Sequence, residues 1–300
     1  MSSADHPVIW LRCAGQHLGL VPTLGGGVAA WQLDRGEERL DLFRPWDGLS
    51  VDRYTLAAFA MAPWCNRISG GGFTHAGQFY PISPNRENEP YPIHGDGWLQ
   101  PWALTQPRDD SLVMTLESYR FNGNPHEYQA TQTFTLKAWG MEQTVSLVHV
   151  GREPLPYGIG IHPWFVRTAR ARLRAVVQGV WKTAADPLPI AHTEEFPPTW
   201  DLRESVAVNG TLIDNAYTGW SGAASIEWPE HRLKLDINVA ELTQSHCHFY
   251  RPPQGATFCF EPVSHPINAF HLPGQPGLKV LRHEENLTFK VQWRPNSSLA

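Results

Sequence analysis

The chain has 300 residues, 42% of them hydrophobic, and its 24 basic and 29 acidic side chains give a formal net charge of −5. This composition is typical of a globular protein with a substantial core. Because there is no basic excess, we expect neither nucleic acid nor a membrane surface as a partner. The first residues, MSSADHPVIWLRCAG, lack the features of a secretory signal, and no apolar run reaches membrane-spanning length. A soluble, cytoplasmic protein is therefore expected.

Aromatic and cysteine residues add two expectations. The chain has 13 tryptophans, and an indole ring offers a flat apolar face with one polar handle. Such faces suit the C–H surface of a sugar, but a large β core would also need bulky side chains. The four cysteines form no CxxC pair. Cys247 and Cys259 lie in apolar or aromatic surroundings, which predicts small buried hydrophobic residues.

Segments with the two-residue period of β-strands dominate the chain. In chain order they are 111–119, 129–138, 142–150, 232–240, 256–262 and 287–293. Turn-forming clusters separate them, and 25 Gly and 26 Pro disfavour long helices. We expect an all-β fold, an antiparallel sandwich or barrel, in a single domain spanning residues 1–300. The proline-rich segment 185–201 is expected to be a surface connection within it.

The stretch APWCNRISGGGFTHAGQFYPI, residues 62–82, predicts a hairpin. SGGG is a turn signal, and the alternating segment FTHAGQFY resembles a returning strand. Asn66 and Arg67 would then lie near the end of the first strand. An arginine in such apolar surroundings needs several acceptors for its guanidinium, either protein oxygens or those of a ligand. Taken alone, the segment favours a structural role for Arg67.

Three other side chains lie where chemistry is plausible. His94 precedes Gly95 and Gly97, which permit close approach by a ligand. His162 lies between a glycine-rich run and two large aromatic residues in GIGIHPWF. Glu261 follows the apolar strand TFCF, where partial desolvation would raise its pKa and favour a role as a base. The structural alternatives are packed or hydrogen-bonded histidines and a buried ion pair.

A possible metal-binding pattern occurs in SHCHFY. His246 and His248 lie on one side of a predicted strand, with Cys247 on the other, and this spacing suits two zinc ligands. A half-exposed strand with polar alternation would have the same spacing. Since no third ligand follows from the sequence, we predict no metal site.

Together these motifs resemble the aldose 1-epimerase (mutarotase) family. NRI with a glycine-rich turn, the HG pair at 94–95, GIGIHPWF and EPVSHPINAF occur in the family's order. LIDNAY (212–217) is similar to the family's Asp-x-x-aromatic element, and ENLTFKVQW resembles its closing strand. The resemblance covers nearly the whole chain from about VPTLGGGVAAWQL onward. It implies a large, twisted antiparallel β-sandwich, the galactose mutarotase-like supersandwich, with a sugar lying across one face.

The resemblance also implies the chemistry, which is interconversion of the α and β anomers of an aldose. By this likeness His162 is the general acid and Glu261 the general base of ring opening and reclosure. We expect a protonated His162 and an ionised Glu261 in the free enzyme, and a bell-shaped dependence of rate on pH. No electrons are transferred, so neither a cofactor nor a metal is required.

Substrate-binding roles follow from the same resemblance. They fall on Arg67, His94 and Asp214, with Asn66 as a neighbour and Trp164 as a wall beside the acid. Trp164 stands where many relatives have tyrosine. The segment SPNRENEPYPIHGDG (83–97) also differs from the corresponding sequence of galactose-acting members, which leaves the sugar preference open.

The leading interpretation is a mutarotase for a free aldose such as galactose, glucose, arabinose or fucose, as a monomer or homodimer. One alternative is a hexose-6-phosphate mutarotase, which would need a cationic pocket for a dianion. The basic run RTARARLR (167–174), shortly after His162, keeps this alternative open. Another is a sugar-binding protein of the same fold without turnover. The presence of both His162 and Glu261 argues against it, since binding alone needs no matched acid and base.

Overall fold

Strands account for almost all regular structure in the computed structural model, which describes residues 6–105, 107–183, 185–240 and 246–297. Within these residues the helical segments are short 3-10 turns, and none is long and apolar enough to cross a membrane. The 3-10 turns are η2 (Arg53–Thr55), η3 (Gly97–Leu99), η4 (Phe121–Gly123), η5 (Leu202–Glu204), η6 (Pro229–His231) and η7 (Ala269–His271). The predicted all-β class is confirmed.

The larger of two main sheets has 11 antiparallel strands among the described residues. They are β1 (Ile9–Cys13), β2 (Gln16–Val21), β3 (Gly27–Arg35), β4 (Glu38–Asp41), β5 (Ala58–Met61), β13 (Gly160–Val166), β15 (Gly179–Thr183), β16 (Pro189–Thr193), β18 (Ile213–Thr218), β21 (His246–Arg251) and β22 (Thr257–Val263). Their order is β1-β2-β3-β5-β13-β22-β21-β18-β15-β16, and β4 pairs with β3.

The second main sheet has nine strands in the same part of the chain. They are β8 (Ala103–Leu104), β9 (Ser111–Tyr119), β10 (Glu127–Lys137), β11 (Gly140–His149), β14 (Arg172–Ala175), β17 (Val206–Ala207), β19 (Ala223–Trp228), β20 (Leu233–Ala240) and β24 (Asn286–Ser297). Their order is β17-β14-β19-β20-β24-β11-β10-β9-β8. Two small two-stranded sheets complete the fold: the hairpin of β6 (Gly72–His75) and β7 (Gln78–Pro81), and the long-range pair of β12 (Leu155–Tyr157) with β23 (Lys279–Leu281).

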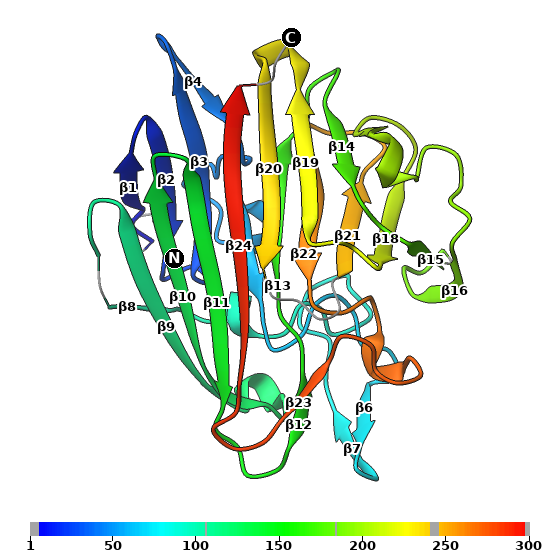
Figure 1. Cartoon of the computed structure of the whole chain (residues 1–300). Coiled ribbons are helices and arrows are strands. Elements are labelled where there is room, and N and C mark those ends of the chain that lie inside the picture. The colour runs from blue at the N-terminus through cyan, green and yellow to red at the C-terminus, as the bar shows by residue number, and fades with distance from the viewer. Residues whose placement is uncertain (1–5, 106, 184, 241–245, 298–300) are drawn as a thin grey trace.

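The two main sheets form a sandwich, with β24, β11 and β10 in front of the larger sheet in Figure 1. Trp293 of β24 makes a T-shaped contact with Phe43 at 5.6 Å between ring centroids and a tilted contact with Phe165 of β13 at 6.2 Å. All three rings are fully buried. Apolar side chains on the inner faces of the two sheets thus meet in one core. This confirms the expected sandwich.

All six strands predicted from alternation are present, but the predicted hairpin at 62–82 is misplaced. The hairpin consists of β6 and β7, and its turn is at Ala76 and Gly77, whose φ angles of 49° and 81° suit a type I′ turn. SGGG (69–72) leads into the hairpin, with Gly72 as the first residue of β6, instead of forming its turn. A Cβ on Gly72 would lie 2.1 Å from the carbonyl oxygen of Tyr80, so this glycine allows close strand pairing. Asn66 and Arg67 consequently lie in a loop.

Two other expectations need correction. The segment 185–201 is not only a connection, because it contains the edge strand β16, which pairs with β15. The strand around SHCHFY is not half-exposed. β21 lies between β22 and β18 in the sheet, and both of its faces are covered, so His246 and His248 are buried.

Candidate active site

A cavity of about 250 Å³ lies on the face of the larger sheet that points away from the core. All seven side chains singled out from the sequence line it: Asn66, Arg67, His94, His162, Trp164, Asp214 and Glu261. Five further residues line it as well: Tyr54, Arg86, Ile93, His248 and Tyr250. The fold therefore gathers groups separated by nearly 200 positions into one enclosed space.

The two-residue period of the strands decides which side chains face the cavity. On β22, Phe260 belongs to the core, so its neighbour Glu261 points to the other face. On β13, Phe165 is in the core and His162 faces the cavity. Four consecutive strands, β13, β22, β21 and β18, contribute His162, Glu261, His248 and Asp214 in that order.

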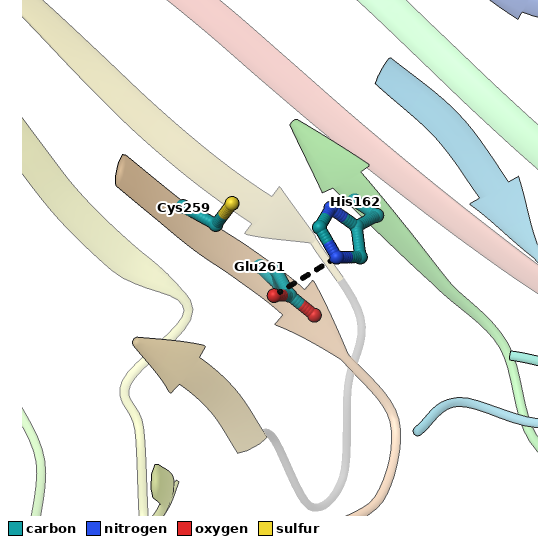
Figure 2. Close-up of side chains that lie close together, drawn as sticks. All are labelled: His162, Cys259 and Glu261. Carbon is teal, nitrogen blue, oxygen red and sulfur yellow. Dashed lines mark ion pairs between the residues drawn. The ribbon is translucent and has the colours of Figure 1, made fainter. Parts of the chain in front are cut away.

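His162 and Glu261 form one of two acid–base pairs that line the cavity. The Nε2 atom of His162 lies 3.4 Å from the Oε1 atom of Glu261, as Figure 2 shows. Strand register produces this approach, since Gly160 opposes Val263 and Trp164 opposes Cys259, which brackets the pair. Both side chains are buried, with 5% and 2% of their surface exposed.

Burial decides the protonation of this pair. Burial, assisted by the positive charges of His248 and Arg44, lowers the pKa of His162 to about 3. Burial raises the pKa of Glu261 to about 7, although His248 and Arg67 act in the opposite direction. The expected raised pKa of Glu261 is confirmed, even though the residue lies within β22 and not at its end.

Burial disfavours the expected combination of a protonated His162 and an ionised Glu261 in the free protein, because it lowers the pKa of His162 and raises that of Glu261. The low-dielectric site disfavours two separated charges, and at 3.4 Å the pair lacks a short hydrogen bond that would compensate for their desolvation. These shifts favour a neutral pair near pH 6, with the exchangeable proton on Glu261. Such a pair still combines one proton donor with one proton acceptor.

Aromatic rings hold the His162 imidazole in place. Phe59 stacks on it with ring centroids 4.8 Å apart and planes 26° from parallel. Trp164 lies tilted beside it at 5.4 Å, and His94 meets it edge-on at 5.0 Å. The ring therefore has little freedom except to present its nitrogen atoms to Glu261 and to the cavity.

A second acid–base pair, His248 with Asp214, lies next to the first. The Nε2 atom of His248 is 2.7 Å from the Oδ1 atom of Asp214, and His248 opposes Glu261 in the register of β21 and β22. Burial alone would lower the pKa of His248, but the carboxylates of Glu261 and Asp214 outweigh it and raise that pKa. Burial opposes ionisation of Asp214, yet the hydrogen bond from His248 lowers its pKa. Both shifts favour a charged imidazolium–carboxylate pair.

The loops above the sheet supply the other wall. Arg67 donates from Nε and Nη2 to the two carboxylate oxygens of Glu89, at 3.0 and 2.9 Å, so a protein carboxylate satisfies its guanidinium as one alternative anticipated. The backbone N–H of Asn66 donates to Nδ1 of His94 at 3.0 Å. Burial lowers the pKa of His94, which makes it a neutral acceptor there. Its neighbour Gly95 has φ 69°, and a Cβ at that position would lie 2.0 Å from a backbone oxygen.

Five residues that line the cavity carry buried polar atoms without a hydrogen-bond partner among the described residues. The atoms are Tyr54 Oη, His162 Nδ1, Trp164 Nε1, His248 Nδ1 and Glu261 Oε2. Buried polar groups are normally paired, because an unpaired one costs on the order of 1–3 kcal/mol. These five residues therefore place both donors and acceptors without a protein partner beside one cavity.

A metal ion is the other ligand these groups could hold. Potential ligand atoms of His162, Cys259 and Glu261 lie within 4.8 Å of one another, and Figure 2 shows the three side chains together. Burial raises the pKa of the Cys259 thiol well above its usual value, which opposes the thiolate that a metal requires. Cys247 and Cys259 are buried, as predicted. The two histidines of the SHCHFY pattern have separate partners: His246 bonds to the Ser264 carbonyl and His248 to Asp214.

Sequence inspection missed His248, Tyr250, Tyr54, Arg86 and Ile93 as parts of the site. One signal was present for His248 and Tyr250. They are two residues apart on the strand β21, so both side chains point to the same face of the sheet. Arg86 was included only within the segment 83–97, without a role of its own. Its position over the cavity depends on long-range contacts that no local pattern encodes.

Comparisons with known proteins agree with this geometry. A family model described as aldose 1-epimerase matches residues 18–294. The uncharacterized protein YphB of Escherichia coli K12 is 30% identical over 264 residues, covering 84% of this chain and 89% of that protein. A crystal structure from Escherichia coli K12, provisionally described as an aldose 1-epimerase, has a TM-score of 0.90 at 26% identity, over 97% of this chain and 99% of its own. A galactose mutarotase-like protein of Clostridium acetobutylicum shares the fold, with a TM-score of 0.83 at 18% identity over 99% and 97% of the two chains.

Proposed function

The chain belongs to the aldose 1-epimerase family, and on that premise we propose that it catalyses interconversion of the α and β anomers of a monosaccharide. The observation that carries the proposal is the His162–Glu261 pair, which holds one proton between a donor and an acceptor 3.4 Å apart at the floor of the cavity. A cavity of about 250 Å³ suits one sugar ring better than a longer chain of sugars.

The reaction needs two proton transfers and no redox step. One member of the pair takes the proton from the C1 hydroxyl while the other gives a proton to the ring oxygen. The bond between C1 and the ring oxygen breaks, its electron pair stays on that oxygen, and C1 becomes an aldehyde carbon. Rotation about the C1–C2 bond and reclosure by the reverse transfers give the other anomer.

The neutral pair supports either direction of proton transfer. With the proton on Glu261, Glu261 is the donor and neutral His162 the acceptor. The tautomer with a protonated His162 and an ionised Glu261 exchanges these roles, which matches the assignment implied by the family resemblance. Each positioned group contributes about 10²–10⁴-fold to such a transfer.

The surrounding residues bind and orient the sugar in this proposal. Asp214, Arg67 and His94 contact its hydroxyl groups from three sides of the cavity, and Asn66 positions His94 through the hydrogen bond to its Nδ1 atom. Trp164 offers an indole face, which suits the C–H surface of a pyranose. Its own position is supported by the guanidinium of Arg44, which lies 4.5 Å from its ring centroid.

The basic run at 167–174 does not favour the hexose-6-phosphate alternative. None of its residues lines the cavity, and Arg170 and Arg172 are bonded elsewhere, to Glu230 and Ser205.

The non-catalytic alternative is disfavoured by the His162–Glu261 pair, which also carries the proposal. A single domain over residues 1–300, the cytoplasmic location and the monomer or homodimer state stay predictions from the sequence.

Nuclear magnetic resonance exchange spectroscopy between the anomers of galactose, glucose, arabinose and fucose tests the proposal. We expect a saturable acceleration of exchange with at least one of them, above the rate in buffer. Saturable binding of these sugars without any acceleration would contradict the catalytic proposal and support a sugar-binding protein.

A further inference from the structure

The cationic side chains around the cavity differ in whether they are paired. Arg67 is paired with Glu89, and His248 with Asp214. Arg86 also lines the cavity, yet no carboxylate lies within ion-pair distance of it in the part of the chain that the structure describes. Its guanidinium stacks on Tyr54, whose ring centroid lies 3.6 Å from the central guanidinium carbon.

The loop that carries Arg86 is fastened on both sides of it. Before Arg86, the Asn85 side chain donates to the carbonyls of Ile93 and Gly95 at 2.8 and 2.7 Å and accepts from the N–H of Ile93 at 2.8 Å. After Arg86, the carboxylate of Glu89 accepts two hydrogen bonds from the guanidinium of Arg67 in a bidentate arrangement. A guanidinium stacked on a ring and carried by an anchored loop is partly pre-ordered, so less entropy is lost when it binds a ligand.

The guanidinium of Arg86 thus leaves a positive charge at the cavity wall without a carboxylate partner among the described residues. Arg86 does not contribute to the pKa shift of Glu261, whereas Arg67, His248 and Asp214 do. It is therefore the charged lining residue that the mechanism leaves unused. The same segment, SPNRENEPYPIHGDG, is the part of the sequence that departs from the galactose-acting relatives.

We propose that Arg86 recognises an anionic substituent on the sugar, remote from C1, and that the preferred substrate is an acidic aldose of the hexuronate class. This inference rests on the proposed anomerase function and specifies its substrate. The planar fork of a guanidinium matches a carboxylate, which carries one negative charge, through two parallel hydrogen bonds. A phosphate dianion calls for further cations, and the other two in the cavity already have carboxylate partners.

The test compares catalysed anomer exchange of glucuronate and galacturonate with that of glucose, galactose and their 6-phosphates. For the wild-type protein we expect kcat/KM for a hexuronate to exceed that for its parent aldose by about 10-fold or more, as for one charge-assisted hydrogen-bonded contact. Added salt should reduce this preference, since Arg86 is exposed. In Arg86→Gln the ratio of the two values should fall to about one.

A matched control is Arg108→Gln, which removes an exposed arginine outside the cavity and should leave both values unchanged. Equal kcat/KM values for hexuronates and parent aldoses, or an Arg86→Gln variant that keeps the wild-type ratio, would overturn the inference while leaving the anomerase function intact. A stronger preference for 6-phosphates than for hexuronates would overturn the choice of a carboxylate. Failure of the proposed function is recognised separately, as no acceleration with any of these sugars.

Discussion

The Nε2 atom of His162 lies 3.4 Å from the Oε1 atom of Glu261, and the remaining polar atom of each side chain has no partner among the described residues. The two groups come from adjacent strands, more than 90 positions apart in the chain, and both are buried. Such a pair is poised to exchange protons with a ligand that enters the cavity, because no competing protein group occupies those atoms.

Replacement of Glu261 by Gln should lower kcat for anomer exchange by about 10²–10⁴-fold, because the amide cannot take or release the shared proton. Exchange spectroscopy on the best substrate measures the loss. The amide has nearly the same shape as the carboxyl group, so circular dichroism and the thermal midpoint should stay close to those of the wild type. Wild-type turnover in a folded Glu261→Gln protein would contradict the mechanism.

Activity should decline as the pH rises through about 7. The competent form holds one proton on the pair, which acquires a second one only near the pKa of His162, about 3, and loses its proton near the pKa of Glu261, about 7. We expect kcat/KM to fall about 10-fold from about pH 6 to about pH 8, after subtraction of the buffer rate. A rise over that range would instead identify the ionised carboxylate with a separate donor as the competent form.

His248→Gln should shift the alkaline limit of this profile to higher pH. The charged groups around Glu261 are His248, Asp214 and Arg67, and the imidazolium of His248 stabilises the ionised carboxylate. Without it the pKa of Glu261 rises, so the proton is lost at higher pH. Rate measurements across the pH range reveal the shift.

His246→Gln is the matched control on the same strand, since His246 is buried, bonds to the Ser264 carbonyl and does not line the cavity. Its profile should keep the wild-type limit. An unmoved limit in His248→Gln would show that this imidazole does not set the charge of Glu261.

Trp293→Ala should destabilise the fold by about 3–5 kcal/mol, the usual cost of removing a large buried aromatic side chain. Trp293 is fully buried between the sheets, in contact with Phe43 and Phe165. Denaturant unfolding provides the measurement. Trp10→Ala, at a position that is 38% exposed, should cost far less, and equal losses would argue against a core centred on Trp293.

Local patterns were sufficient for much of this fold. Alternation at 111–119 matches β9 residue for residue, and it predicts strands at β10, β11, β20, β22 and β24. Local motifs, combined with family resemblance, selected seven side chains that line one cavity. It failed at 62–82, where two turn signals compete and the local sequence does not state which one closes the hairpin.

The sequence by itself determined the strand content, the apolar faces that form the core and the identity of His162 and Glu261 as chemical groups. Only the tertiary structure decided their protonation, because a pKa depends on burial and on charges such as those of His248 and Arg44, which arrive from other strands and loops. It also decided that Arg86 lies over the cavity while the basic run at 167–174 does not. The two-residue period of a strand depends on residues that are neighbours in the sequence. The desolvation of a side chain and the charges around it depend on the folded three-dimensional structure.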